Sequence, residues 1–121
     1  MAQDLRTRTK RFALRIIRLY SALSNSSTVS QVIGKQVLRS GTSVGAHYRE
    51  AFRSRSDAEF ISKIQGGLQE LEETVYWLEL LIESNLVSEA KLQNLLAEAS
   101  ELTAIFVSSV NKVKQKKQLA K

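Results

Sequence analysis

The chain contains no proline among its 121 residues, and it has only five glycines. Proline and glycine interrupt regular backbone structure, and β-rich folds need the frequent turns that these residues supply. A chain with so few interruptions is expected to form long helices joined by short connections. Its length is enough to bury one hydrophobic core, so we expect a single domain over residues 1–121.

Apolar residues recur at helical spacing in two N-terminal segments, at about 4–23 and about 28–53. The polar run 24–27 separates them, and Thr28 is expected to cap the second helix. The expected inward faces consist of Leu5, Phe12, Ile16, Leu19 and Leu23 in the first helix, and Ile33, Val37, Gly41, Val44, Tyr48 and Phe52 in the second.

Three glycines, Gly34, Gly41 and Gly45, lie inside the second predicted helix. Each costs up to about 1 kcal/mol relative to alanine in a helix, so a kink near residues 40–45 is the main threat to this prediction. Close approach of a neighbouring helix is the reading we favour for them. A backbone site for a ligand is the alternative.

Two further helices are predicted at about 57–84 and about 89–113. Their expected inward faces consist of Phe60, Ile64, Gly67, Leu71, Thr74, Leu78 and Leu81 in the third helix, and Leu92, Leu95, Ala99, Leu102, Phe106, Ser109 and Val113 in the fourth. Ser56 and Glu59 form a capping box, Asn85 is suited to the left-handed conformation that ends a helix, and Ser88 is expected to cap the fourth helix. We expect the basic tail at 114–121 to fray. Short connections make consecutive helices antiparallel neighbours, so the predicted fold is an all-α, up-down-up-down four-helix bundle.

A second apolar stripe runs along the third and fourth predicted helices, beyond what one bundle core needs. A broad intramolecular core is the alternative, but we favour a contact between copies of the chain, because exposed apolar surface has to be covered. The expected interface residues are Ile61, Leu68, Val75, Tyr76, Ile82, Leu96 and Val110.

Basic residues gather at both ends of the chain, whereas the middle is acidic; the net charge is +6. In an up-down-up-down bundle, the start of the first helix, the end of the second, the start of the third and the end of the fourth share one pole. A basic pole of this kind suits phosphate backbones. Its expected members are Arg6, Arg8, Lys10, Arg11, Arg49, Arg53, Arg55, Lys63, Lys112, Lys114, Lys116 and Lys117.

The alternative for these cations is that they pair locally with Glu50, Asp57 and Glu59, and that the lysine tail only aids solubility. The aromatic residues Phe12, Tyr20 and Phe52 are expected in the core rather than among the basic residues. Any binding of nucleic acid is therefore expected to be directed at the backbone and weakly sequence-specific.

Residues that could carry chemistry are few. The chain has no cysteine and a single histidine, His47, whereas zinc sites use three or four protein ligands. The glycines lack the lysine–serine sequence that follows a phosphate-binding loop. We expect no catalytic site, no metal and no cofactor. No stretch reaches the roughly 18 apolar residues of a membrane span. Arg15 and Arg18 interrupt the apolar run 12–23, which is therefore not expected to be a signal-peptide core, and we expect a cytoplasmic protein.

Three segments are distinctive in combination: RSGTSVGAHYREA at 39–51, RSRS at 53–56 followed by EFISK at 59–63, and ETVYWLELL at 73–81. Together they closely resemble the bacterial four helix bundle protein family, also called 23S rRNA intervening-sequence proteins. The resemblance covers about residues 4–113. It implies an antiparallel bundle that assembles into a homo-oligomeric ring, typically a pentamer. A related branch serves as the accessory protein of diversity-generating retroelements, where a basic ring partners a reverse transcriptase and its RNA.

Two departures from the family pattern stand out. His47 occupies a position where asparagine is usual, and Gly66-Gly67 replaces a bulkier pair that favours helix more strongly. Adjacent glycines cost roughly 2 kcal/mol of helix propensity, which puts the straightness of the third helix in doubt there.

The sequence as a whole favours a non-enzymatic, homo-oligomeric binding module whose basic pole engages RNA or DNA. A protein partner such as a reverse transcriptase fits the same hypothesis. A protein–protein scaffold without nucleic-acid binding is the alternative.

Overall fold

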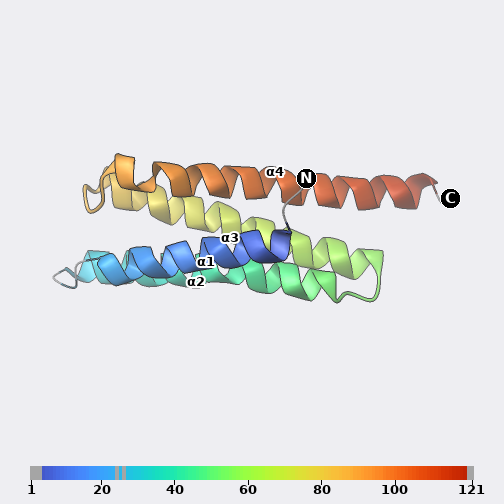
Figure 1. Ribbon diagram of the computed structural model, residues 1–121, viewed down its shortest axis with the longest axis horizontal. Helices are drawn as coiled ribbons and strands as arrows, with labels where there is room; N and C mark the ends of the chain where they lie inside the picture. The colour runs from blue at the N-terminus through green and yellow to red at the C-terminus, as the bar shows by residue number, and fades with distance from the viewer. Residues whose placement is uncertain (1–3, 24, 26, 120–121) are drawn as a thin grey trace.

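The computed structural model describes residues 4–23, 25 and 27–119. These residues form four helices and no strand: α1 (Leu5–Ala22), α2 (Thr28–Phe52), α3 (Asp57–Glu83) and α4 (Glu89–Leu119). Figure 1 shows the helices lying lengthwise beside one another, with the α1–α2 and α3–α4 connections at one end and the α2–α3 connection at the other. The predicted all-α, four-helix fold is confirmed.

Polar side chains cap the N-termini of the first three helices by accepting hydrogen bonds from amides of the first turn. The carboxylate of Asp4 accepts a hydrogen bond from the Arg6 amide at 3.0 Å, and the Ser56 hydroxyl accepts one from the Glu59 amide at 3.1 Å. The predicted cap at Thr28 is wrong by one residue. Ser27 has extended backbone and accepts from the Ser30 amide at 3.0 Å, so Thr28 is already helical.

The predicted end of α3 is confirmed at Asn85. This residue has φ of 64°, in the left-handed region, and it directs the following amides back onto the helix. The amides of Leu86 and Val87 donate to the Leu81 carbonyl at 3.0 and 3.1 Å. The chain thereby reverses within a few residues and begins α4 at Glu89.

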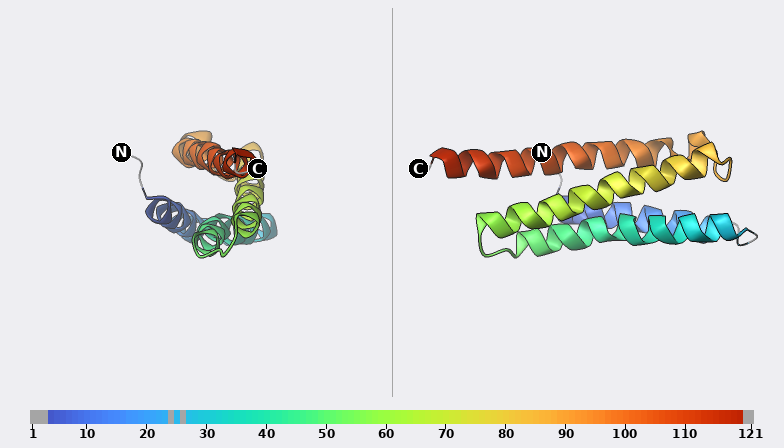
Figure 2. Two further views of the ribbon diagram at one scale, coloured as in Figure 1. Left: turned by 90° about the vertical axis from the view of Figure 1, so that its right-hand side faces the viewer. Right: turned by 180° about the vertical axis from the view of Figure 1, so that it is seen from behind.

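The end of α4 differs from the prediction. The helix continues beyond residue 113 to Leu119, so residues 114–119 are helical rather than a frayed tail; residues 120–121 of that tail lie outside the described chain. Lysine, glutamine and leucine are good helix formers, and Lys116 and Lys117 complement the negative end of the helix dipole. The last turns of α4 therefore extend past the α2–α3 connection (Figure 2).

The core consists of side chains from all four helices, and the predicted inward faces supply most of it. Phe12, Ile16, Leu71, Leu102 and Phe106 are fully buried. Others of the core are Val37, Val44, Ile64, Leu78, Leu81, Leu92, Leu95 and Ala99. One expected core residue is wrong: Phe52, at the end of the α2 stripe, is 74% exposed.

The glycines of α2 mark close approach by α1, as we favoured. A Cβ atom on Gly41 would lie 2.6 Å from Cγ1 of Ile16, and one on Gly45 would lie 3.2 Å from Oγ1 of Thr9. Thr9 is itself fully buried, and its hydroxyl donates to the Leu5 carbonyl at 2.7 Å. The helix α2 runs unbroken through these glycines, so the expected threat of a kink at 40–45 does not materialise.

On its other side, α2 packs against α3 through small polar groups. The hydroxyl oxygens of Ser40 and Thr74 lie 2.8 Å apart in a buried contact. At the rim of this contact, the Arg39 guanidinium donates to Glu70 and Glu73, and Nε1 of Trp77 donates to Glu73 at 3.2 Å. The hydrogen bond from Arg39, aided by that from Trp77, lowers the pKa of the Glu73 carboxyl.

The α1–α4 seam is the least packed of the bundle. Contacts between these two helices are far fewer than those of α2 with either neighbour. The end-on view in Figure 2 shows α1 and α4 separated on the open side of the bundle. Arg8 bridges the seam: its guanidinium donates to both carboxylate oxygens of Glu98, at 2.6 and 3.1 Å.

The glycine contact yields a stability prediction. We expect Gly41→Ala to lower the free energy of unfolding by about 1–2 kcal/mol, because overpacking against the β-branched Ile16 outweighs the gain of about 1 kcal/mol in helix propensity. Gly45→Ala is the matched comparison on the same helix, since its Cβ would lie 3.2 Å from Oγ1 of Thr9, a milder contact than the 2.6 Å at Gly41, and it should cost less stability than Gly41→Ala. Urea unfolding followed by circular dichroism at one protein concentration measures both. Equal stabilisation by the two substitutions would contradict the packing argument.

Candidate nucleic-acid interface

Most of the predicted basic pole is exposed. The end of α2, the start of α3 and the end of α4 lie at one end of the bundle, and α1 begins part-way along α4 on the same side (Figure 1). Exposed members of the predicted set are Arg6, Lys10, Arg11, Arg49, Arg53, Arg55, Lys112, Lys114, Lys116 and Lys117. Because a helix rises 1.5 Å per residue, Lys10 and Arg11 lie about 6–8 Å further along α1 than Arg6, toward the middle of the bundle.

The structure brings Arg6 of α1 together with Arg49 and Arg53 of α2. These three cations line one small surface depression with Tyr48 and Phe52. No ion pair found among the described residues involves any of the three arginines. Three guanidinium groups from two helices therefore border a depression that holds two aromatic side chains. The Asp4 carboxylate lies close enough to contribute to the raised pKa of Tyr48, and Phe52 also borders a second depression with Asp57.

Phe52 is the functional candidate that the sequence pattern missed. Its spacing places it on the inward stripe of α2, but α1 does not reach far enough to cover it. Thr9 lies against Gly45, and α1 begins only one turn earlier, at Leu5, whereas Phe52 lies two turns beyond Gly45. Tyr48, one turn before Phe52, still packs on Phe106, with ring centroids 6.1 Å apart, and its burial raises the pKa of its hydroxyl.

Arg8 does not belong to the free cations of the pole. Its side chain is only 17% exposed, and Glu98 and Glu101 of α4 both contact its guanidinium. The hydrogen bond to Glu98 raises the pKa of Arg8 further above its usual value. The prediction of Arg8 as a nucleic-acid contact is therefore corrected: its charge holds α1 to α4.

Lys63 is also engaged within the protein. Its ammonium lies 2.9 Å from the Glu50 carboxylate, and this hydrogen bond raises the pKa of Lys63 and lowers that of Glu50. The pair borders a surface depression shared with Arg53, Arg55 and Glu59, so the charge there is mixed. Local pairing, the alternative to nucleic-acid binding, thus describes Lys63 but not the cluster around Phe52.

The two departures from the family pattern, His47 and the pair Gly66-Gly67, lie against each other in the structure. A Cβ atom on Gly66 would lie 2.8 Å from both Cε1 and Nδ1 of His47, and one on Gly67 would lie 2.7 Å from the Phe106 ring. The imidazole therefore uses space that a side chain at residue 66 would fill, and α3 stays helical through both glycines. Nδ1 of His47 is buried without a hydrogen-bond partner in the described part of the chain.

The second apolar stripe forms a groove of about 740 Å³ between α3 and α4. Leu68, Val75, Tyr76 and Leu96, all predicted interface residues, line it. Tyr76 is 53% exposed, whereas Ile61 and Ile82 are partly buried against the core. Val110 is a correction: it is only 5% exposed and belongs to the core, because α4 turns that side toward the other helices.

Within residues 4–119, apart from the undescribed positions 24 and 26, no group of three or more histidine, aspartate or glutamate side chains is arranged to hold a metal ion. None of the four helices, over their described residues, is both long and apolar enough to cross a bilayer.

The Arg8 bridge yields a second prediction. Arg8→Gln should lower the free energy of unfolding by about 1–2 kcal/mol, because it leaves the partly buried Glu98 carboxylate without its charged partner. Arg6→Gln is the control on the same helix, since Arg6 is exposed, and it should leave stability unchanged within about 0.5 kcal/mol. Thermal and urea unfolding of the two variants measure the difference. If Arg8→Gln were as stable as Arg6→Gln, the bridge would contribute nothing to the fold.

Comparison with known proteins agrees with the sequence resemblance. The model of the family described as "23S rRNA-intervening sequence protein" matches residues 3–108. A crystal structure of a protein of unknown function from the S23 ribosomal protein family of Bacteroides thetaiotaomicron VPI-5482 superposes with a TM-score of 0.83 at 37% identity, covering 88% of this chain and 98% of that one. No curated protein matches the chain. The chain belongs to the 23S rRNA-intervening sequence protein family.

Proposed function

We propose that this protein is a non-enzymatic binding module that engages the phosphate backbone of RNA or DNA through its basic pole. The observation that carries the proposal is that Arg6, Arg49 and Arg53 line one surface depression together with the exposed Phe52, with no carboxylate among the residues that line it. Guanidinium groups are suited to phosphate oxygens, and an exposed aromatic ring offers a stacking surface to an unpaired base.

The end of α4 adds a second set of positive charges. Lys112, Lys114, Lys116 and Lys117 are exposed on a helical segment, and no ion pair found among the described residues includes them. Contacts of this kind neutralise phosphates without reading base edges. The proposed binding is therefore tight at low salt and nearly independent of sequence.

Self-association is part of the same proposal. Leu68, Val75 and Leu96 line the groove between α3 and α4, and Tyr76 is half exposed in it, so a second copy that covered the groove would remove apolar surface from water. We propose that the antiparallel bundle assembles into a homo-oligomeric ring, which the family resemblance predicts to be a pentamer. A ring would repeat the basic pole around one axis and so multiply its attraction for a long polyanion.

A reverse transcriptase as protein partner stays a prediction that comes from the family resemblance alone. The competing function is a scaffold that acts only through proteins. The two functions differ in one measurable property, which is the salt-dependent binding of nucleic acid by the purified chain.

We expect replacement of Arg6, Arg49 and Arg53 by glutamine to weaken binding of a single-stranded RNA and to flatten its salt dependence. Each lost phosphate contact removes about 0.7 from the slope of log K against log salt on single strands, so the slope should fall by roughly 2. Fluorescence anisotropy over a potassium chloride series measures it.

The matched control is Lys35→Gln with Gln69→Glu and Gln93→Glu, which lowers the net charge by the same amount outside the pole. It should leave the slope within about 0.5 of the wild type, because bulk charge alone makes no specific contact. An absence of binding by the intact protein near about 50 mM salt, where phosphate contacts are strongest, would make the scaffold the better description.

Phe52 is expected to favour unpaired bases. Base stacking on an aromatic side chain contributes about 1–3 kcal/mol, so Phe52→Ala should weaken single-stranded RNA binding by about 5- to 150-fold and duplex DNA binding much less. Phe52→Leu, which keeps apolar surface without a ring, should behave like the alanine variant. Val32→Ala, at an exposed apolar position elsewhere on α2, is the control. Equal losses on single strands and duplexes would mean that Phe52 does not stack.

A further inference from the structure

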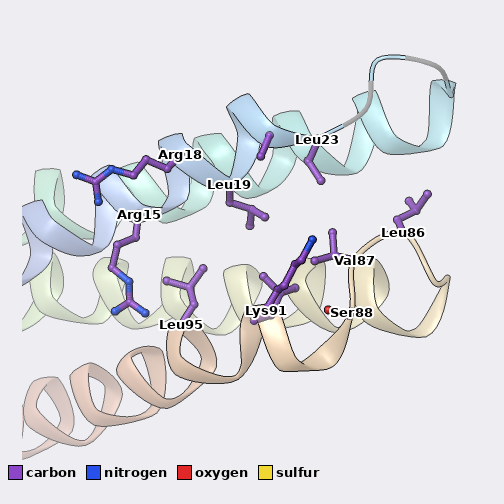
Figure 3. A pocket seen from close by; sticks show the side chains of 11 residues that line it. Arg15, Arg18, Leu19, Leu23, Leu86, Val87, Ser88, Lys91 and Leu95 are labelled. Atoms are coloured by element: carbon purple, nitrogen blue, oxygen red, sulfur yellow. The ribbon is translucent and has the colours of Figure 1, made fainter.

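The open α1–α4 seam contains a cleft (Figure 3). It lies near the α1–α2 and α3–α4 connections, at the end of the bundle opposite the basic pole (Figure 1). Its volume is about 510 Å³, and it lies between the second half of α1 and the beginning of α4. Leu19 of α1 and Leu23, which directly follows α1, face Val87 and Leu95 across it (Figure 3). The Lys91 side chain points from α4 toward α1, into this space.

All charged residues that line the cleft are cations. They are Arg15, Arg18 and Lys91, and none of them takes part in the ion pairs found among the described residues. Lys91 lies between the leucines rather than at one end of them. A ligand with a single acidic group and an apolar tail matches this arrangement poorly. An amphipathic helix that alternates acidic and apolar side chains matches it well.

The chain itself carries such a face on α3. Glu72, Val75, Tyr76 and Glu79 recur at helical spacing and line the groove between α3 and α4. Glu72, Tyr76 and Glu79 are exposed, and neither glutamate takes part in an ion pair found among the described residues. The negative charge of this surface complements the cations of the cleft, and its apolar side chains can cover the leucines there.

We infer that the α3 face of one copy of this chain, formed by Glu72, Val75, Tyr76 and Glu79, docks into the α1–α4 cleft of the next copy. The inference rests on the self-association in the proposed function, and it names the two surfaces that meet. It is independent of whether the basic pole binds nucleic acid.

The contact is heterologous, because the two surfaces are different parts of the molecule. The cleft lies on the side of α4 that faces α1, and the groove lies on the side that faces α3. Each copy thus presents one surface to each of two neighbours. Successive copies related by a constant rotation close into a ring when the rotation divides a full turn.

A mixing experiment tests this arrangement. Arg15→Glu with Arg18→Glu reverses the charge of the cleft and leaves the α3 face intact. Val75→Glu with Tyr76→Glu replaces the apolar side chains of the α3 face and leaves the cleft intact. Each variant alone should be a folded monomer by light scattering and circular dichroism. An equimolar mixture should form a complex of two chains and stop there, because the remaining cleft and the remaining face are then both acidic and repel each other.

Two matched controls accompany the variants. Lys10→Glu with Arg11→Glu reverses two exposed charges on α1 outside the cleft, and Val29→Glu with Val32→Glu changes two exposed apolar positions on α2. Both controls should assemble like the wild type. Adding Glu72→Arg and Glu79→Arg to the cleft variant, in one chain, should restore assembly. The α3 face then carries the arginines and the cleft the glutamates, so the two surfaces attract each other again.

The outcomes separate this inference from the proposed function. A monomeric wild-type protein would overturn the docking and the self-association on which it rests, but not the binding of nucleic acid by the basic pole. A wild-type oligomer that persists in either double variant would overturn the docking and leave self-association standing. An oligomer of the cleft variant alone would indicate that the intact α3–α4 groove pairs with itself. Monomeric variants that fail to combine when mixed would show that the cleft and the α3 face do not meet, which also overturns the docking.

Discussion

Close packing on both sides of α2 depends on residues with little or no side chain. Gly41 and Gly45 let α1 approach until Ile16 and Thr9 touch the α2 backbone, and Ser40 meets Thr74 of α3 in a buried hydroxyl pair. Both neighbours of α2 are held tightly, whereas α4 is attached mainly through α3. The open α1–α4 seam is therefore a consequence of where the small residues lie. The bridge from Arg8 to Glu98 closes that seam near the start of α1 and leaves a cleft at the other end of the helix.

The same arrangement sorts the charged residues into structural and available groups. Arg8, Arg39 and Lys63 each contact carboxylates on a neighbouring helix, and their charges are balanced within the protein. Arg6, Arg49 and Arg53 line a depression without a carboxylate at one end of the bundle. At the other end of the bundle, Arg15, Arg18 and Lys91 also line a cleft without a carboxylate. Leucines surround this second set, whereas the first set lies beside a phenylalanine. The different apolar surroundings are the reason to assign the first cluster to nucleic acid and the second to a protein surface.

Some residues could be assigned from spacing alone, and others depended on helix register. The periodicity of α3 and α4 correctly identified Leu71, Leu78, Leu102 and Phe106 as core, because each helix has neighbours along that whole length. Phe52 follows the α2 period equally well, yet it is exposed because α1 begins too late to cover it. Val110 was assigned to an interface by its heptad spacing, but it is buried because α3 and α4 meet on that side.

Local chemistry in the sequence by itself determined the helical fold, the turns and the amount of positive charge. The absence of proline, the cap at Ser56 and the left-handed turn at Asn85 act within a few residues, so they can be read without knowing the neighbours. Only the tertiary structure decided which charges are free and where the bundle is open. Those properties depend on the axial offset between helices. That offset is set by contacts such as Thr9 on Gly45 and His47 on Gly66, between residues far apart in the chain.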